Sequence, residues 1–162
     1  MFERYSILAR QAVMVARIEA GQVGADQIDS EHLLIGVLSV HPELPELLNT
    51  SIELSQLRGR CDRWHTPSSP IPNSQDLPIT PDLNRVFARV ASIADGERCP
   101  EIRTEHLLLS MVGEPCHASQ MLADCGISEE SLLALVANLN CEAPQTGTAA
   151  ALEAMKALFS GP

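Results

Sequence analysis

The amino-acid sequence predicts an all-α protein that contains two tandem copies of one multi-helix unit. The motif Ser-Glu-His-Leu-Leu at Ser30–Leu34 recurs 74 residues later as Thr-Glu-His-Leu-Leu at Thr104–Leu108. The flanking apolar positions also match at this spacing. No run of alternating β-branched residues, which is typical of strands, is present. A period this long indicates two copies of a multi-helix unit rather than a solenoid of short repeats.

The duplication extends well beyond the motif. At the 74-residue spacing the matched pairs are Ser6 with Thr80, Val13 with Phe87, Ala16 with Val90, Ala20 with Ala94, Ile28 with Ile102, Val37 with Met111 and Leu38 with Val112. After one inserted residue they continue as Leu47 with Leu122, Ile52 with Ile127 and Leu57 with Leu132. We therefore expect repeat 1 over residues 1–65, a linker over 66–79, repeat 2 over 80–139, and a C-terminal linker with a short helix over 140–162.

The first repeat begins with an expected helix over Ser6–Ala20, capped by Ser6 and stopped by Gly21. Its apolar face is mostly small, which would let another helix approach closely. Ser30 is the expected N-cap of the motif helix, and Glu31 lies in its first turn, where the helix dipole favours an anion. Shorter helices are expected over Leu44–Asn49 and Glu53–Trp64.

Four prolines make residues 66–78 unsuitable for a helix, which predicts the linker: Pro67, Pro70, Pro72 and Pro78. Thr80-Pro81-Asp82 then gives a strong helix start, with a cap hydroxyl, a proline at the first helical position and an early acid. Thr104 begins the second motif helix. Further helices are expected at Ser119–Cys125, at Ser128–Leu139 with Ser128 as cap, and at Ala149–Phe159.

Composition narrows the function classes. The 162 residues carry a formal net charge of −10, which disfavours nucleic acid as a partner. No apolar stretch is long enough for a membrane span or a signal core, so neither a membrane nor secretion is expected. The five cysteines are odd in number and form no Cys-x-x-Cys pattern. We therefore expect reduced thiols rather than a disulfide framework, and a cytoplasmic location.

The Glu31-His32 and Glu105-His106 pairs have two interpretations. They could be acid–base pairs or metal ligands, but adjacent helical side chains point about 100° apart and do not converge. The pattern His-Glu-x-x-His is absent, and so are a P-loop and a Gly-x-Ser-x-Gly elbow. We expect both histidines to pack or hydrogen-bond between helices. The glutamates, each one residue inside a helix start, are the better ligand-binding candidates.

Two other features are weaker functional candidates. Cys116-His117 has no second pair at metal-ligand spacing, so we expect an ordinary thiol and a surface histidine. No metal, cofactor or catalytic residue is expected. Phe2 and Tyr5 are either exposed aromatics that bind a partner or a cover for the core.

The duplicated Ser/Thr-Glu-His-Leu-Leu unit resembles the Clp amino-terminal (Clp-N) repeat domain of ClpC- and ClpA-type AAA+ unfoldases. The opening Met1–Ser6 resembles the ClpC-type start, and the resemblance covers about residues 1–140. It implies two pseudo-symmetric four-helix repeats that recruit adaptors and substrates for an ATPase ring.

In ClpC-type members, the motif glutamates and the hydroxyls at the first-helix starts bind phosphorylated arginine. The resemblance carries these roles to Glu31 with Ser6, and to Glu105 with Thr80. A guanidinium pairs with a carboxylate, and a phosphate with a hydroxyl and a helix N-terminus. The chain departs from the family at Asp29 and Arg103, where a glycine is usual, and at Asp82-Leu83, where basic residues are usual.

The resemblance thus implies a non-catalytic module that binds adaptor proteins or protein substrates, arginine-phosphorylated ones included, for an AAA+ unfoldase ring in cis or in trans. The alternative is a stand-alone Clp-N protein that regulates or competes with a full-length unfoldase. An enzyme on this scaffold is a third class, which a hydrolase or metal-content assay would detect.

Overall fold

The computed structural model describes residues 1–66, 68–147, 153 and 156, and in this part of the chain it is all-α. No strand is present among the described residues; two isolated β-bridges are. The helices are α1 (Ile7–Gln22), α2 (Ser30–Val40), α3 (Leu44–Leu47), α4 (Leu54–Cys61), α5 (Pro81–Gly96), α6 (Thr104–Val112), α7 (His117–Asp124) and α8 (Glu129–Ala137). The predicted fold class is confirmed.

The helix boundaries follow the sequence duplication. Helices α1 and α5 start and end 74 residues apart, α2 and α6 start 74 apart, and α4 and α8 start 75 apart. The two halves therefore have the same helix order. Most of the expected C-terminal helix at 149–159 lies outside the described residues. The two described residues in this range, Glu153 and Lys156, are both helical.

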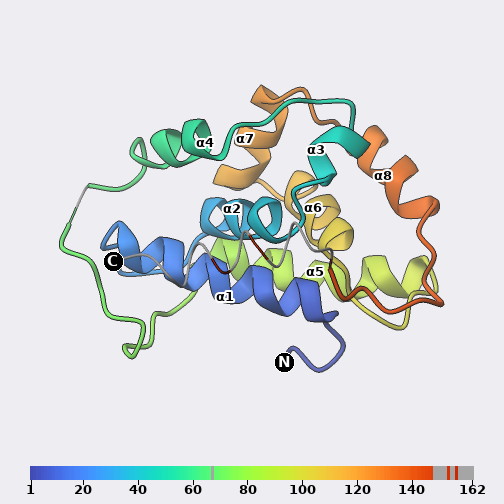
Figure 1. Ribbon diagram of the computed structural model, residues 1–162, viewed down its shortest axis with the longest axis horizontal. Coiled ribbons are helices and arrows are strands. Elements are labelled where there is room, and N and C mark those ends of the chain that lie inside the picture. The colour runs from blue at the N-terminus through green and yellow to red at the C-terminus, as the bar shows by residue number, and fades with distance from the viewer. Residues whose placement is uncertain (67, 148–152, 154–155, 157–162) are drawn as a thin grey trace.

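Helices α2 and α6 lie in the middle of the molecule, between α1 and α5 on one side and α3, α4, α7 and α8 on the other (Figure 1). Small side chains let α1 and α2 approach closely, as the sequence predicts. Ala9, Ala12 and Ala16 are fully buried, and a Cβ atom built on Gly36 would lie 2.3 Å from the Ala12 carbonyl oxygen. Only glycine fits this crossing without displacing backbone.

The two repeats are joined reciprocally. Tyr5, just before α1, forms a bridge with Ile102, just before α6, while Ile28, before α2, forms a bridge with Ile79, before α5. As a result, the first helix of each repeat starts beside the motif helix of the other repeat.

The predicted caps of three helices are confirmed. The hydroxyls of Ser6, Thr80 and Ser128 accept from backbone N–H groups three residues later, at 3.0, 3.2 and 3.1 Å respectively. Each satisfies a donor that the helix start would otherwise leave unpaired.

The proline-rich segment contains no helix from residue 68 to 79 and runs back along α1. Its Ile71 N–H donates to the Gly21 carbonyl at 2.8 Å, and Arg17 donates to the Pro72 carbonyl at 2.7 Å. A second tie to α1 comes from Arg58 in α4, whose guanidinium donates to the buried Glu19 carboxylate at 2.6 Å. The hydrogen bond to Glu19 raises the pKa of Arg58.

The expectation that all five cysteines are reduced is wrong. Cys99 and Cys141, 42 residues apart, form a disulfide, while Cys61, Cys116 and Cys125 are free. Counting cysteines could not find this pair, because the two residues follow α5 and α8 and meet only through packing.

Of the two interpretations left open for Phe2 and Tyr5, the structure favours a cover for the core. Tyr5 is only 4% exposed, and burial raises its pKa to about 12. Phe2 is half-buried and lies edge-on to Phe87, with ring centroids 5.5 Å apart. These aromatics cover the core. No described helix is long and apolar enough to cross a membrane.

Candidate functional site

Each motif histidine accepts a backbone hydrogen bond at the N-terminus of its own helix. The N–H of Asp29 donates to Nδ1 of His32 at 3.0 Å, and the N–H of Arg103 donates to Nδ1 of His106 at 2.9 Å. Burial, the main cause, lowers the pKa of both imidazoles to about 4. They are therefore neutral at pH 7, with the remaining proton on Nε2.

Ser30 is not the N-cap of its helix, contrary to expectation, whereas Thr104 begins α6 as expected. Ser30 and Thr104 are the first helical residues, and Asp29 and Arg103 precede them. The Ser30 hydroxyl instead accepts from the Ala118 N–H at the start of α7, at 3.1 Å. The motif hydroxyl of repeat 1 therefore caps a helix of repeat 2.

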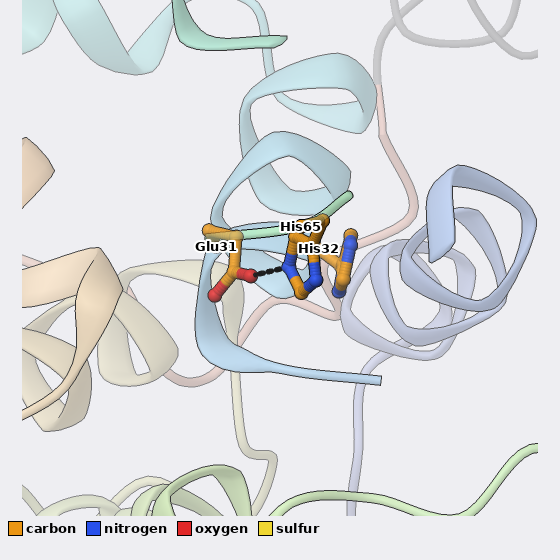
Figure 2. A group of neighbouring side chains, drawn as sticks. All are labelled: Glu31, His32 and His65. Carbon is orange, nitrogen blue, oxygen red and sulfur yellow. Dashed lines mark hydrogen bonds and ion pairs between the residues drawn. The ribbon is translucent and has the colours of Figure 1, made fainter. Parts of the chain in front are cut away.

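We call the surroundings of Glu31 site 1. Glu31 is fully buried, and its Oε1 atom meets Nε2 of His65, just after α4 (Figure 2). Its Oε2 atom lies 3.1 Å from Nδ1 of His117, at the start of α7. The same nitrogen lies 3.6 Å from Oδ2 of Asp29. Two carboxylates and two imidazoles therefore meet at the start of α2.

Aromatic stacking orients both imidazoles of site 1. The His117 ring stacks on Trp64 with centroids 4.2 Å apart and planes 7° from parallel. The His65 ring stacks on His32 at 4.9 Å, as Figure 2 shows. Stacking fixes the ring planes, so the nitrogens point at the Glu31 carboxylate.

We call the surroundings of Glu105 site 2. Here a glutamine from the segment after α8 contacts the glutamate: Gln145 Nε2 donates to Glu105 Oε2 at 2.8 Å. The other end of the same amide, Oε1, accepts from the Ser6 hydroxyl at 2.8 Å and from the Thr104 N–H at 3.2 Å. His41 Nδ1 lies 2.8 Å from the Thr104 hydroxyl.

The expected pairing of hydroxyls with glutamates is exchanged. Thr80 lies at site 1, where its hydroxyl donates to Asp29 Oδ1 at 3.0 Å, and Ser6 lies at site 2. The reciprocal bridges explain the exchange, because they place each first helix beside the motif helix of the other repeat. Each site therefore contains residues of both repeats.

The residue just before the motif helix is acidic in one repeat and basic in the other, which gives the two sites different formal charges. Asp29 precedes α2, whereas Arg103 occupies the corresponding position before α6. Arg103 donates to the Asn140 carbonyl at 2.7 Å and also contacts the Ala143 carbonyl. It therefore holds the segment that carries Gln145 over site 2.

Sequence reasoning missed the residues that contact the two glutamate carboxylates. His65, His117, His41 and Gln145 lie outside the motifs, and nothing in their local sequence distinguishes them. His117 was expected to be an ordinary surface histidine. Two sets of donor atoms in site 1 are compact enough for a metal ion, each within 4.8 Å: Glu31, His32 and His65, and Asp29, Glu31 and His117.

Comparisons with known proteins identify relatives of most of the chain. No protein-family model matches it. The chaperone protein ClpD1 of Oryza sativa subsp. japonica, named as chloroplastic, is 28% identical over 119 residues, covering 68% of this chain. The chaperone protein ClpD of Arabidopsis thaliana, also named as chloroplastic, is 24% identical over 167 residues, covering 96%. The chain spans only 13% and 16% of the length of these two relatives.

Solved structures support the fold. The N-terminal domain of ClpD from Arabidopsis thaliana has a TM-score of 0.70 at 23% identity, covering 84% of this chain and 96% of that domain. The Hsp104 N-terminal domain of Candida albicans has a TM-score of 0.65 at 14% identity, covering 91% of this chain and 99% of that domain.

Proposed function

We propose that this chain, which has the fold of a Clp amino-terminal domain, is a non-catalytic recognition module that binds adaptors or protein substrates for a Clp unfoldase. Its relatives are chaperones several times its length, and it aligns with a small part of each. A small domain of this kind can recruit partners while the ATPase activity resides in another region or another chain. The AAA+ ring would lie in the same chain or in a separate one.

The observation that carries this proposal is the pair of buried glutamates at equivalent helix starts. Glu31 is fully buried and Glu105 is 4% exposed. A buried carboxylate is costly unless it has charged or hydrogen-bonding partners. A guanidinium group would supply such a partner, and the nearby helix N-terminus favours an anionic group on the same ligand. Arginine-phosphorylated proteins carry both groups on one side chain.

Site 2 has the donor and acceptor pattern that such a ligand requires. Gln145 presents N–H to Glu105 and an oxygen to Ser6 and Thr104. In the proposed complex, a guanidinium takes the place of the amide nitrogen and a phosphate oxygen that of the amide oxygen. Gln145 thus acts as an internal stand-in that the ligand displaces.

Calorimetry with phosphoarginine tests the proposal, with free arginine and phosphoserine as controls. We expect binding of phosphoarginine at two sites, each removed by the matching Glu31→Ala or Glu105→Ala change. Salt should weaken binding only slightly, because both glutamates are buried and buried charge pairs are screened much less than exposed ones. An absence of heat with the parent chain, or binding that survives in the double variant, would leave only docking of adaptors elsewhere.

The alternative is a stand-alone protein that regulates or competes with a full-length unfoldase. Adding the purified chain to an unfoldase assay separates the two interpretations. A competitor lowers the degradation of adaptor-dependent substrates as its concentration rises, whereas a module that acts only within its own ATPase does not.

A further inference from the structure

Three donor atoms of site 1, one of them from the Glu31 carboxylate that the proposed function assigns to a guanidinium, also have the spacing of a metal site. Nδ1 of His117 lies 3.1 Å from Glu31 Oε2 and 3.6 Å from Asp29 Oδ2. All three donor atoms lie within 4.8 Å of one another. In a tetrahedral Zn²⁺ site, with metal–ligand distances near 2.0–2.2 Å, neighbouring ligand atoms are about 3.3–3.6 Å apart. The three atoms therefore need only small shifts to surround one ion.

The other compact set, which includes His32, is chemically unsuitable. Nδ1 of His32 accepts the Asp29 N–H, so the proton of this neutral imidazole is on Nε2. A metal requires an unprotonated ring nitrogen. His65 alone would then accompany Glu31 in that set, which is too few protein ligands for a tetrahedral site.

We propose that Asp29, Glu31 and His117 form a binding site for one divalent transition-metal ion of the Zn²⁺ class, with a fourth position open to solvent or a ligand. Two carboxylates balance the charge of the ion, and imidazole and carboxylate are both ordinary zinc ligands. The 29% exposure of the His117 side chain gives the ion a path from solvent.

The surrounding residues hold the three ligands in place. Ser30 N–H and the Thr80 hydroxyl occupy Asp29 Oδ1, which leaves Oδ2 for the metal. His65 holds Glu31 Oε1, and Trp64 orients the His117 ring. Such partners of ligands are a usual feature of metal sites.

The His32 imidazole lies in the same cluster as Glu31 and His65 (Figure 2). Its ring is 1% exposed, and its Nε2 atom has no hydrogen-bond partner within the described part of the chain. The equivalent Nε2 of His106 at site 2 is unpaired in the same way, so this feature is common to both sites and the metal proposal rests on Asp29, Glu31 and His117.

Site 2 is a natural negative control. Arg103 replaces Asp29 there, which removes one ligand and adds a positive charge. Glu105 is bound by the Gln145 amide, and His41 Nδ1 lies 3.9 Å from Glu105 Oε1. The inference is therefore one metal ion per chain, at site 1.

The test is calorimetry of the untagged chain with ZnCl₂. The chain carries Cys125→Ser, because this partly exposed free thiol could itself bind Zn²⁺. A parallel titration with Co²⁺ follows the fluorescence of Trp64, the single tryptophan, which stacks on His117. We expect one ion per chain and quenching that saturates at the same ratio.

Three variants distinguish the proposed ligands from residues outside the site. Asp29→Asn, which keeps a good capping residue, and His117→Gln should each lower the affinity for Zn²⁺ tenfold or more. Glu105→Gln, at site 2, should change it less than threefold. Circular dichroism checks that each variant is folded. A parent chain that takes up no ion would overturn the proposal, as would affinity that survives in His117→Gln or is lost in Glu105→Gln.

Discussion

Sites 1 and 2 have the same backbone frame but different chemistry. In both, a histidine completes the helix start and a glutamate in the first turn is buried. In site 1, two imidazoles contact the glutamate; in site 2, a glutamine amide does. The comparison shows that duplication preserved the helix starts, while the residues that contact the glutamates diverged.

The contacting residues come from equivalent places in the two halves. His65 follows α4 and Gln145 follows α8, the last helix of each repeat. His117 and His41 flank the connection between the second and third helices of the opposite repeat. Divergence in these connecting segments changed the side chains that contact each glutamate, while the order of the helices stayed the same.

The largest effect that we expect is a loss of folding stability at acidic pH. Burial lowers the pKa of His106 to about 4, from an ordinary value of 6.5. The unfolded chain therefore binds a proton between these values that the folded chain does not. Stability is complete above pH 6.5 and falls as the pH decreases toward 4, by about 3 kcal/mol at most for this one group, since each pKa unit is worth about 1.4 kcal/mol.

Chemical denaturation of the parent and of His106→Gln between pH 4 and 7 checks this prediction. The variant should be less stable at pH 7, because it loses the bond from the Arg103 N–H, but its stability should vary less with pH. Parallel curves for the two proteins would show that His106 does not titrate as expected.

A smaller effect is expected where α1 crosses α2. Gly36→Ala places a Cβ atom 2.3 Å from the Ala12 carbonyl oxygen, so it should destabilise the fold by about 1–3 kcal/mol despite alanine's higher helix propensity. The equivalent position in repeat 2 is Ser110, whose hydroxyl donates to the Val86 carbonyl at 2.7 Å.

Ser110→Ala is the matched control for that crossing. It removes one hydrogen bond without overfilling the space, so it should cost about 1 kcal/mol. Thermal unfolding of both variants measures the difference. A Gly36→Ala protein as stable as the parent would mean that the two helices are farther apart than the structure places them.

The smallest stability effect is expected at Gln145, in the segment after α8. Gln145→Ala should change the unfolding temperature little. If Gln145 stands in for a ligand, however, the change should strengthen phosphoarginine binding at site 2 and leave site 1 unaffected. Titration in a Glu31→Ala background isolates site 2. Weaker binding in that background would instead make Gln145 part of the ligand site.

The sequence by itself determined the features that depend on neighbouring residues. The helices that begin after Ser6, Thr80 and Ser128 are capped by local hydrogen bonds. The 74-residue duplication predicted that both halves have the same helix order. The small face of the first helix predicted that another helix would approach it closely, and the structure shows that this helix is α2. The positions of Glu31 and Glu105 in the first turns of their helices followed from the same local pattern, whereas their burial did not.

Only the tertiary structure decided what those glutamates meet. The contacts of Glu31 with His65 and with His117 span 34 and 86 residues, and the contact of Ser6 with Gln145 spans 139. The exchange of Ser6 and Thr80 between the sites and the Cys99–Cys141 disulfide have the same origin. Local propensity and periodicity are set within a few turns of chain, whereas these contacts depend on how the two repeats dock, which no local pattern encodes.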